Sequence, residues 1–338
     1  MKAVVLVGGE GTRLRPLTET IPKPLLPLMG RSFLHHVLDH LGAHGVHEVI
    51  LSSPYLQERF ASFIRERHGD PLVTWITESS PLGTGGAVLN ALGNVEEAFF
   101  VLNGDILTDL DLTAMAAAHD ASGASISIST IYVEDARPFG LVVTDETGRV
   151  LEFCEKPADP TPGEINAGTY LIDPLAVARF ERGVNTSIER DVFPAVIERG
   201  APVRAFASHC YWMDLGTPEK YLRAHFDILE GKVRGEEFPA PYLDGADIDL
   251  AARLGRWVVA GQGAAVGPEA QVEDSVLLGG AVVSKRARVR DSILGPGSRV
   301  GEGATVVGTV LGEGAEVAAG DSVADARISG HPRSSREA

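Results

Sequence analysis

A repeat of 17 residues in the last third of the 338-residue chain constrains its fold more than any other feature. Aliphatic residues recur at this period in three registers: Val266, Val283, Val300 and Val317; Val272, Val289, Val306 and Val323; Val276, Ile293 and Val310. A shared period indicates stacked coils, each with two six-residue segments and one of five. We expect one aliphatic side chain per face to point inward and small residues to turn the corners. The pattern predicts a three-sided parallel β-solenoid.

The part of the chain before residue 233 shows a different pattern, in which short β-rich runs alternate with helical stretches. This alternation is typical of an α/β layered fold with a mixed, mainly parallel sheet. Helices are expected to begin near Ser32, near Ser187 and at Thr217, which precedes a proline suited to the first helical position. Strands are expected at residues 3–7, 48–51, 72–76, 98–102 and 125–132.

The two patterns divide the chain into domains. We predict a Rossmann-like α/β domain over residues 1–232 and a repeat domain over 257–328. Residues 233–256 contain prolines and several acidic side chains without a clear period, and are interpreted as a linker. The polar, charged tail of residues 329–338 is expected to be disordered.

Charge and hydropathy exclude some classes of protein. A formal net charge of −16 disfavours nonspecific binding to nucleic acid or to an anionic membrane. The apolar run at residues 3–7 is too short for a signal-peptide core, and no stretch reaches the roughly 18 apolar residues of a membrane helix. We therefore expect a cytoplasmic protein without a nucleic-acid or membrane partner.

A glycine-rich segment follows the first predicted strand. Glycine at positions 8, 9 and 11 allows backbone N–H groups to approach an anion closely. Thr12 adds a hydroxyl donor, Arg13 adds a fork of charged donors, and Lys23 is confined between two prolines. The segment fits neither a Walker A motif nor the GxGxxG dinucleotide fingerprint. It predicts a triphosphate-binding loop, and the alternative is a glycine-rich turn with surface cations.

Two aspartates are candidate metal ligands. Asp105 follows a buried predicted strand and Asn103-Gly104, the position at which open α/β sheets bind ligands. Asp214 follows Tyr211-Trp212-Met213. Mg²⁺ takes one or two protein carboxylates when phosphates and water complete its shell. The pair therefore suits a Mg²⁺–triphosphate site, although either aspartate alone could serve in a turn or a helix cap.

The segment from Gly8 to Thr18, followed by Pro22-Lys23-Pro24, resembles the signature of nucleotidyltransferases that make nucleoside-diphosphate sugars. The resemblance continues to about residue 225, and several members of that family carry a C-terminal left-handed β-helix of hexapeptide repeats. It implies a catalytic set of Arg13, Lys23, Asp105, Lys156 and Asp214, with Mg²⁺ on the two aspartates. It implies a nucleotide-binding set of Leu6, Gly8, Gly9, Gly11, Thr12, Arg13, Lys23, Glu78, Pro81, Gly83, Thr84, Asn103 and Asp105. It implies a sugar-phosphate-binding set of Gly140, Glu155, Lys156, Asn166 and Gly168.

Within this family, the guanylyltransferases that act on mannose 1-phosphate are the nearest resemblance. It rests on residues 6–9, on Pro81-Leu82-Gly83-Thr84-Gly85-Gly86, on residues 165–170 and on Thr186-Ser187-Ile188-Glu189 with Val192-Phe193-Pro194. The implied substrates are GTP and mannose 1-phosphate, and the alternative is glucose 1-phosphate with dTTP or UTP. A homo-oligomer is also expected, with the β-helix as the candidate interface.

Two other interpretations remain open at this stage. Relatives with the same architecture include non-catalytic regulatory or scaffold subunits, which tend to lose phosphate- and metal-binding residues that this chain retains. In bifunctional relatives the β-helix is an acyltransferase that uses a histidine base, and residues 226–330 contain no histidine. An assembly or regulatory role is therefore the better expectation for the solenoid.

Overall fold

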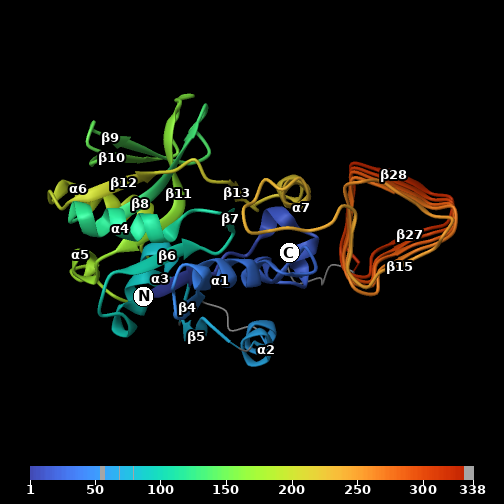
Figure 1. Ribbon diagram of the computed structural model, residues 1–338, viewed down its shortest axis with the longest axis horizontal. Coiled ribbons are helices and arrows are strands. Elements are labelled where there is room, and N and C mark those ends of the chain that lie inside the picture. Colours follow the sequence, from blue (N-terminus) through green and yellow to red (C-terminus); the bar gives the residue numbers. More distant parts are fainter. Residues whose placement is uncertain (54–57, 68, 79, 331–338) are drawn as a thin grey trace, which may run out of the picture. The chain divides into compact units, whose positions relative to one another are not determined.

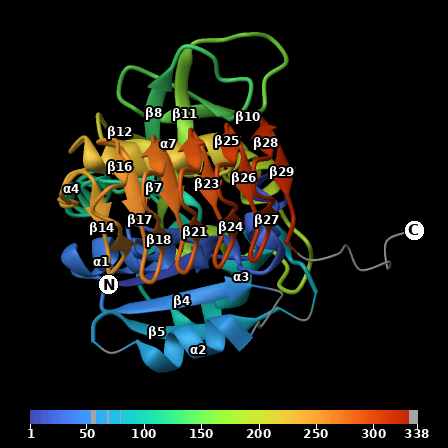
Figure 2. The ribbon, with the colours of Figure 1, turned by 90° about the vertical axis from the view of Figure 1, so that its right-hand side faces the viewer.

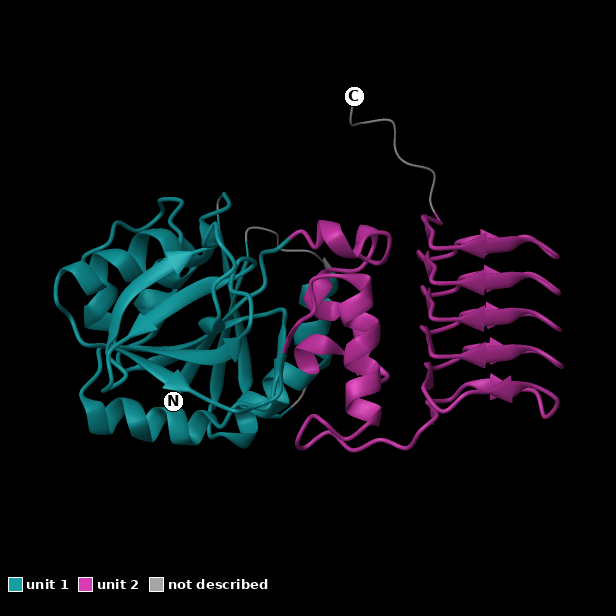
Figure 3. Cartoon of the chain, turned by 90° about the horizontal axis from the view of Figure 1, so that it is seen from above, with its two compact units in different colours: residues 1–9, 36–212 teal, residues 10–35, 213–338 magenta. Residues whose placement is uncertain are grey.

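The computed structural model describes residues 1–53, 58–67, 69–78 and 80–330, so residues 331–338 of the predicted disordered tail lie outside the described part. The chain forms two compact units (Figure 3). Unit 1 contains residues 1–9 and 36–212, and unit 2 contains residues 10–35 and 213–338. The glycine-rich segment is therefore divided, since Gly8 and Gly9 belong to unit 1 and Gly11 belongs to unit 2.

Unit 1 is built on a nine-stranded mixed sheet (Figure 1). Its strands are β1 (Lys2–Leu6), β4 (Glu48–Ser53), β5 (Leu72–Thr77), β6 (Phe99–Asn103), β8 (Ile126–Val133), β9 (Gly140–Thr144), β10 (Val150–Glu155), β11 (Gly163–Ile172) and β12 (Val203–Ala207). The main path runs β10-β9-β11-β6-β1-β4-β5, while β8 pairs with β11 and β12 pairs with β8. The β6-β1-β4-β5 strands are parallel, and β11 is antiparallel to β6. The predicted mixed, mainly parallel α/β fold is confirmed.

Helices cover this sheet because their apolar faces need a partner. They are α1 (Phe33–Ala43), α2 (Glu58–Glu66), α3 (Gly83–Ala91), η4 (Leu92–Asn94), α4 (Leu112–Ser122), α5 (Pro174–Val177), the π-helical turn η5 (Ile188–Val192) and α6 (Phe193–Glu198). Val88 of α3, Phe193 of α6 and Tyr170 of β11 are all buried in one core with β1 and β6. The predicted start near Ser187 is confirmed, because the Ser187 hydroxyl accepts from the Arg190 N–H.

Unit 2 ends in the predicted solenoid, which Figure 1 views down its axis as a triangle. Three parallel sheets form its sides, in the orders β14-β17-β20-β23-β26-β29, β15-β18-β21-β24-β27 and β16-β19-β22-β25-β28, and Figure 2 shows the coils stacked side by side. This arrangement is consistent with a left-handed β-helix. Its strands are β14 (Tyr242–Leu243), β15 (Asp247–Ile248), β16 (Arg253–Leu254), β17 (Val258–Ala260), β18 (Ala265–Val266), β19 (Gln271–Glu273), β20 (Ser275–Leu277), β21 (Val282–Val283), β22 (Arg288–Arg290), β23 (Ile293–Leu294), β24 (Arg299–Val300), β25 (Thr305–Val307), β26 (Val310–Leu311), β27 (Glu316–Val317), β28 (Ser322–Ala324) and β29 (Arg327–Ile328).

Two of the three predicted registers point into the solenoid, and the third points out. The Val266 and Val272 columns belong to its core, together with Leu277, Leu294 and Leu311. The Val276 column occupies the alternate positions of the same strands, and neighbouring residues on a strand face opposite sides. Its members are nevertheless buried, because helix α7 (Pro218–Leu229) packs on this outer face. The prediction that Val276, Ile293 and Val310 point inward is wrong by one position.

The solenoid also begins earlier than the repeat pattern indicates. Strands β14, β15 and β16 form its first coil, within residues 233–256 of the predicted linker. Ile248 pairs with Val266, and Leu254 pairs with Val272. The sequence separation within each of these pairs is one residue longer than that between Val266 and Val283 or between Val272 and Val289, the next pairs along the solenoid. The first coil therefore breaks the period, and its acidic residues conceal it further.

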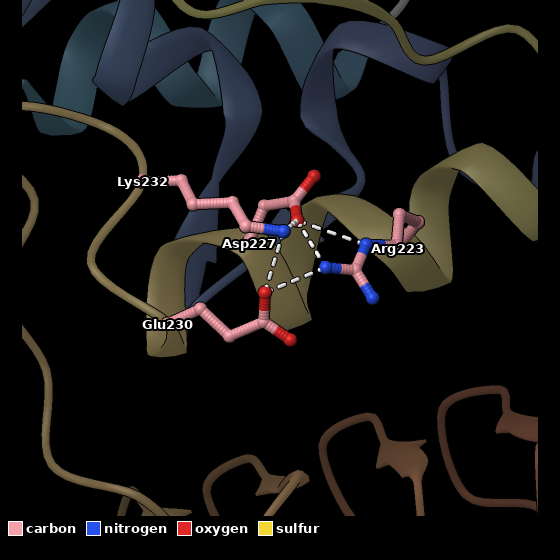
Figure 4. Close-up of polar contacts among 4 residues, drawn as sticks. All are labelled: Arg223, Asp227, Glu230 and Lys232. Atoms are coloured by element: carbon pink, nitrogen blue, oxygen red, sulfur yellow. Dashed lines mark hydrogen bonds and ion pairs between the residues drawn. The ribbon is translucent and has the colours of Figure 1, made fainter.

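Unit 2 also contains η1 (Thr12–Leu14), η2 (Leu17–Glu19), η3 (Lys23–Leu25), β2 (Pro27–Leu28) and β3 (Arg31–Ser32). Helix α7 begins at the predicted position, where Thr217 accepts from the Lys220 N–H. A network at its C-terminal end joins four charged residues (Figure 4). The buried Asp227 carboxylate accepts from Arg223 and Lys232, and Glu230 accepts from the same two side chains. These pairs fix the end of α7 before the chain enters the solenoid.

Candidate active site

The phosphate-loop residues of unit 2 lie on short 3-10 turns. Gly11 has a φ of +64°, a left-handed conformation that favours glycine. A Cβ at Gly11 would lie 3.0 Å from Thr18 Cγ2 and 3.3 Å from Lys23 Cβ, so the turn at Gly11 packs directly against the stem of Lys23. The Thr18 hydroxyl donates to the Gly11 carbonyl at 2.7 Å. Exposed Thr12 and Arg13 follow on η1, and Lys23 opens η3.

Arg13 and Asp214 converge on Gly216 within unit 2. A Cβ at Gly216 would lie 2.7 Å from Asp214 Oδ1 and 2.8 Å from Arg13 Nη2. Only glycine leaves room for both groups at this point. Lys220, in the first turn of α7, donates to Asp214 Oδ2. Asp214 retains 18% exposure and Lys220 41%, so solvent screens this ion pair in part.

The donor chemistry at Asp214 fits a hard cation. Its carboxylate is partly buried and already accepts from an ammonium group, so the position stabilises positive charge. Within the described residues there is no cluster of three or more His, Cys, Asp or Glu side chains with metal-binding geometry. Mg²⁺ does not require such a cluster, since it is bound through one or two carboxylates together with substrate phosphates.

In unit 1, the ends of β1 and β6 approach each other closely at Gly104. The Gly104 N–H donates to the Leu6 carbonyl at 2.9 Å, and a Cβ at Gly104 would lie 2.6 Å from that oxygen. Asn103 therefore sits at the carboxyl end of β6, beside the end of β1. Its Oδ1 atom is buried and accepts no hydrogen bond among the described residues. An unsatisfied buried acceptor is costly and is often found where a ligand binds.

A bulge in β11 brings a second segment next to Asn103. Its pairing with β8 shifts register between Asn166 and Tyr170. Gly168, with φ of +73°, donates its N–H to Asn166 Oδ1, and a Cβ there would lie 2.8 Å from Asn103 Nδ2. Asn166 Nδ2 donates to the Tyr170 hydroxyl at 2.8 Å. The structure thus brings predicted residues of the nucleotide and sugar sets together.

Carboxylates surround the buried Tyr170. Burial raises the pKa of its hydroxyl well above the usual value, and Glu189, Glu155 and Asp105 raise it further through their negative charge. This places three carboxylates within electrostatic reach of one phenol. Negative charge therefore gathers near Tyr170, which suits sugar hydroxyls as donors and a cation near Asp105.

The predicted sugar-phosphate residues Gly140, Glu155 and Lys156 lie together at the end of the β9–β10 pair. Glu155 pairs with Gly140, where a Cβ would lie 3.0 Å from Glu155 Oε2 and 2.6 Å from Phe153 Cζ. Lys156 has a φ of +55°, and its N–H donates to the Phe139 carbonyl. The Lys156 side chain is 59% exposed, with Nζ 3.7 Å from Glu155 Oε1. Its ammonium group therefore remains available to a bound anion.

The loop before α3 is held by the segment around Ser187. Gly83 has a φ of +71°, and a Cβ there would lie 2.7 Å from the Thr186 carbonyl. The Thr84 hydroxyl donates to Glu189 Oε2 at 2.7 Å and accepts from the Ile188 N–H at 3.0 Å. Ser187 also donates to Glu189 Oε2. The Thr84 side chain is thus occupied within the protein, which leaves the loop backbone as the group that could face a base.

Glu78 has a similar internal role. It is only 5% exposed, and it accepts from the Ser52 hydroxyl and the Leu82 N–H, each at 3.0 Å. The Pro81 carbonyl accepts from Asn185 Nδ2. In this structure both residues shape the loop at Gly83 through contacts with the chain itself.

Several residues at these positions are not distinguished by the sequence alone. Glu189, Tyr170 and Gly216 lie near predicted site residues. The sequence around each of them does not show whether it would contact a ligand or only support a residue that does. Lys220 has the pattern of an ordinary residue in the first turn of a helix. Gly216 could have been found from its position two residues after Asp214. At this position the close approach of Asp214 and Arg13 leaves no room for a side chain.

Comparison with known families defines the class. The nucleotidyl transferase family matches residues 2–231, and the GMPPB C-terminal domain matches residues 242–336. The chain belongs to the nucleotidyl transferase family. The predicted enzyme class is therefore confirmed.

Individual proteins of known name or structure are also similar to this chain. The chain is 38% identical to the mannose-1-phosphate guanylyltransferase of Mycobacterium tuberculosis over 286 residues, which cover 82% of this chain and 80% of that protein. It is 36% identical to mannose-1-phosphate guanylyltransferase 1 of Arabidopsis thaliana over 289 residues, with the same coverages. The crystal structure of HddC from Yersinia pseudotuberculosis complexed with GMP-PN matches 67% of this chain and 98% of that chain, with 31% identity and a TM-score of 0.58.

Proposed function

We propose that this nucleotidyl transferase couples mannose 1-phosphate with GTP to give GDP-mannose and pyrophosphate. The observation that carries the proposal is the identity of 35–38% to proteins named mannose-1-phosphate guanylyltransferase, over about four fifths of the chain for most of them. The retained charged residues Arg13, Lys23, Asp105, Lys156 and Asp214 support it. The alternative within the same fold is transfer from dTTP or UTP to glucose 1-phosphate.

The reaction asks for positioning and charge neutralisation more than for proton transfer. A sugar 1-phosphate has a second pKa near ~6, so at neutral pH it is mostly a dianion and needs no general base. One of its oxygens attacks the α-phosphorus in line, and the bond to the bridging oxygen of pyrophosphate breaks. Lys156, exposed beside Glu155, would hold the nucleophilic phosphate. Arg13 and Lys23 would stabilise the triphosphate and the departing pyrophosphate.

Divalent metal use is general in this family, and we propose Mg²⁺ as the ion, held by Asp105 and Asp214. When bound, it would neutralise charge on the phosphates as the leaving group departs. Lys220 is the group that balances the charge of Asp214 in this structure. A cation bound to Asp214 Oδ2 would take the place of the Lys220 ammonium group there.

Base and sugar choice are assigned to unit 1. Thr84 is committed to Glu189 and to the Ile188 N–H, so we propose that guanine is read by the backbone of the loop at Gly83 and Thr84. Asn166, Gly168 and Glu155 would contact the sugar hydroxyls, since amide and carboxylate oxygens accept from them. The cytoplasmic location and a homo-oligomeric state stay predictions. In the described residues, none of the helices is both long and apolar enough to span a membrane.

The test is a matrix assay of purified protein with Mg²⁺, four NTPs and several hexose 1-phosphates, read by release of pyrophosphate. GTP with mannose 1-phosphate should give the highest kcat/KM. Faster turnover with dTTP or UTP and glucose 1-phosphate would replace the substrate assignment and keep the class. Absence of release with every pair would contradict the catalytic proposal.

A further inference from the structure

The last coil of the solenoid lies against the segment that carries Arg13, and both belong to unit 2. Arg327, at the start of β29, donates from Nη1 to the backbone carbonyl of Arg13 at 2.9 Å. Its other terminal nitrogen, Nη2, lies 3.5 Å from Glu219 Oε1 in the first turn of α7. One guanidinium group therefore joins the turn that bears Arg13 to the helix that begins four residues after Asp214.

Two further contacts follow the same line. The Ser329 hydroxyl donates to Glu19 Oε1 at 3.0 Å. A Cβ at Gly312, one coil earlier, would lie 3.0 Å from Pro16 Cβ, so the backbone of that coil packs directly against the segment. Contacts at residues 13, 16 and 19 span most of the stretch between Gly11 and Lys23.

The repeat pattern itself marks Arg327 as unusual. It pairs with Val310, and so continues the outward column of Val276, Ile293 and Val310. The earlier members of this column are aliphatic and buried beside α7. In the last coil the same position holds a cation with 48% of its side chain exposed. Packing against a helix favours an aliphatic side chain at this position. The forked donors of arginine instead suit a backbone carbonyl with a carboxylate beside it.

We propose that Arg327 is a positioning residue for nucleotidyl transfer, through which the solenoid holds the turn at Thr12–Leu14 and thereby orients the Arg13 side chain toward the triphosphate. This inference rests on the proposed function of Arg13. It gives the solenoid a task in the reaction itself, beyond assembly. Because Arg327 holds the turn that carries Arg13, its effect falls on the nucleotide side of the reaction and leaves the sugar phosphate side unchanged.

The test compares Arg327→Ala with Arg286→Ala. Arg286 is the matched control, because it forms an exposed ion pair with Glu302 on the same solenoid. Loss of one hydrogen bond to the loop should lower kcat/KM for GTP about 5-fold and change the KM for mannose 1-phosphate less than ~2-fold. Arg327→Lys, which keeps one donor for the Arg13 carbonyl, should recover part of the loss. Arg286→Ala should match the unmodified protein.

Amide hydrogen exchange provides a readout that does not depend on turnover. Arg327→Ala should increase exchange in a peptide covering residues 11–20, where the Leu14 and Arg15 N–H groups close the turns, and Arg286→Ala should not. Equal exchange and equal kinetics for the two variants would overturn the inference. Equal losses of activity with both substrates would also overturn it, since that outcome indicates a general structural role. If the unmodified protein transfers no nucleotide, the proposed function fails. Unchanged amide exchange in Arg327→Ala would separately show that the contact between Arg327 and the Arg13 carbonyl does not hold the turn.

Discussion

The two units hold their functional groups in opposite ways. In unit 1 several predicted residues are tied into hydrogen bonds within the fold, such as half-buried Thr84 with Glu189 and buried Glu78 with Ser52. In unit 2 the charged residues lie near the surface on short turns, and glycines at positions 11 and 216 let them approach one another. The contrast follows from the chemistry. Sugars and bases are recognised by a few precisely placed polar groups, and phosphates by cations that solvent partly screens.

The difference has an energetic consequence. A buried polar group that loses its partner costs about 1–3 kcal/mol, so changes in unit 1 should lower stability together with function. An exposed ion pair contributes roughly 0–1 kcal/mol, so changes in unit 2 should alter function with little effect on stability. This comparison can be tested with matched substitutions in the two units.

The largest expected effect lies at the two aspartates. Asp105→Asn and Asp214→Asn should each lower kcat by about 10³-fold or more, because each removes a negative charge assigned to Mg²⁺ among the phosphates. Steady-state pyrophosphate release measures the loss, and circular dichroism should show an intact fold. Both carboxylates are half-buried, so the two variants should lose activity to a similar extent.

Asp120→Asn is the control for both variants. Asp120 is exposed on α4 and should retain full activity when changed. Full activity in Asp105→Asn or in Asp214→Asn would remove that residue from the site.

Two glycines test the comparison directly. Gly168→Ala in unit 1 places a Cβ at positive φ, 2.3 Å from Ile106 Cδ1 and 2.8 Å from Asn103 Nδ2, at a buried position. Strain and overpacking should lower the free energy of unfolding by about 3 kcal/mol. In Gly216→Ala in unit 2, the atoms nearest to the new Cβ are the ends of the Arg13 and Asp214 side chains, which can shift. It should change stability by less than about 1 kcal/mol and lower kcat/KM at least ~30-fold.

Urea unfolding and steady-state kinetics on the same preparations separate the two effects. A Gly216→Ala protein that is as destabilised as Gly168→Ala would break the distinction between the units. Normal activity in Gly216→Ala would mean that Arg13 and Asp214 need not converge during the reaction.

The sequence predicts more of the fold than of the site. Periodicity finds the solenoid because each coil repeats the same packing problem, but it cannot tell an inward column from the outward column of Val276, since α7 buries that column too. It does not find the first coil, because the steps out of that coil are one position longer than the repeat. Motif resemblance identifies the candidate site residues. It cannot show that Thr84 is occupied by Glu189, because such contacts join residues more than 100 positions apart.

The smallest of these effects concerns the pH dependence of stability in unit 1. Burial, followed by the neighbouring His44, lowers the pKa of His40 on α1 from 6.5 to about 4, although Asp109 and Asp111 act in the opposite direction. The ring is therefore neutral in the fold at neutral pH. Between pH 6.5 and about 4 the unfolded chain binds a proton that the folded chain does not, so stability is present above pH 6.5 and is lost as the pH falls through this window.

The loss should reach about 3 kcal/mol near pH 4, measured by urea unfolding at a series of pH values. His40→Gln, which removes the titrating group, should flatten this part of the profile, and His209→Gln at an exposed position should leave it unchanged. A profile that keeps its full slope in His40→Gln would assign the acid sensitivity to other groups. His40 belongs to unit 1, so its titration should leave the turns at Thr12–Leu14 and Lys23–Leu25 of unit 2 intact. Acid should therefore weaken the fold of unit 1 before it changes the phosphate-binding turns.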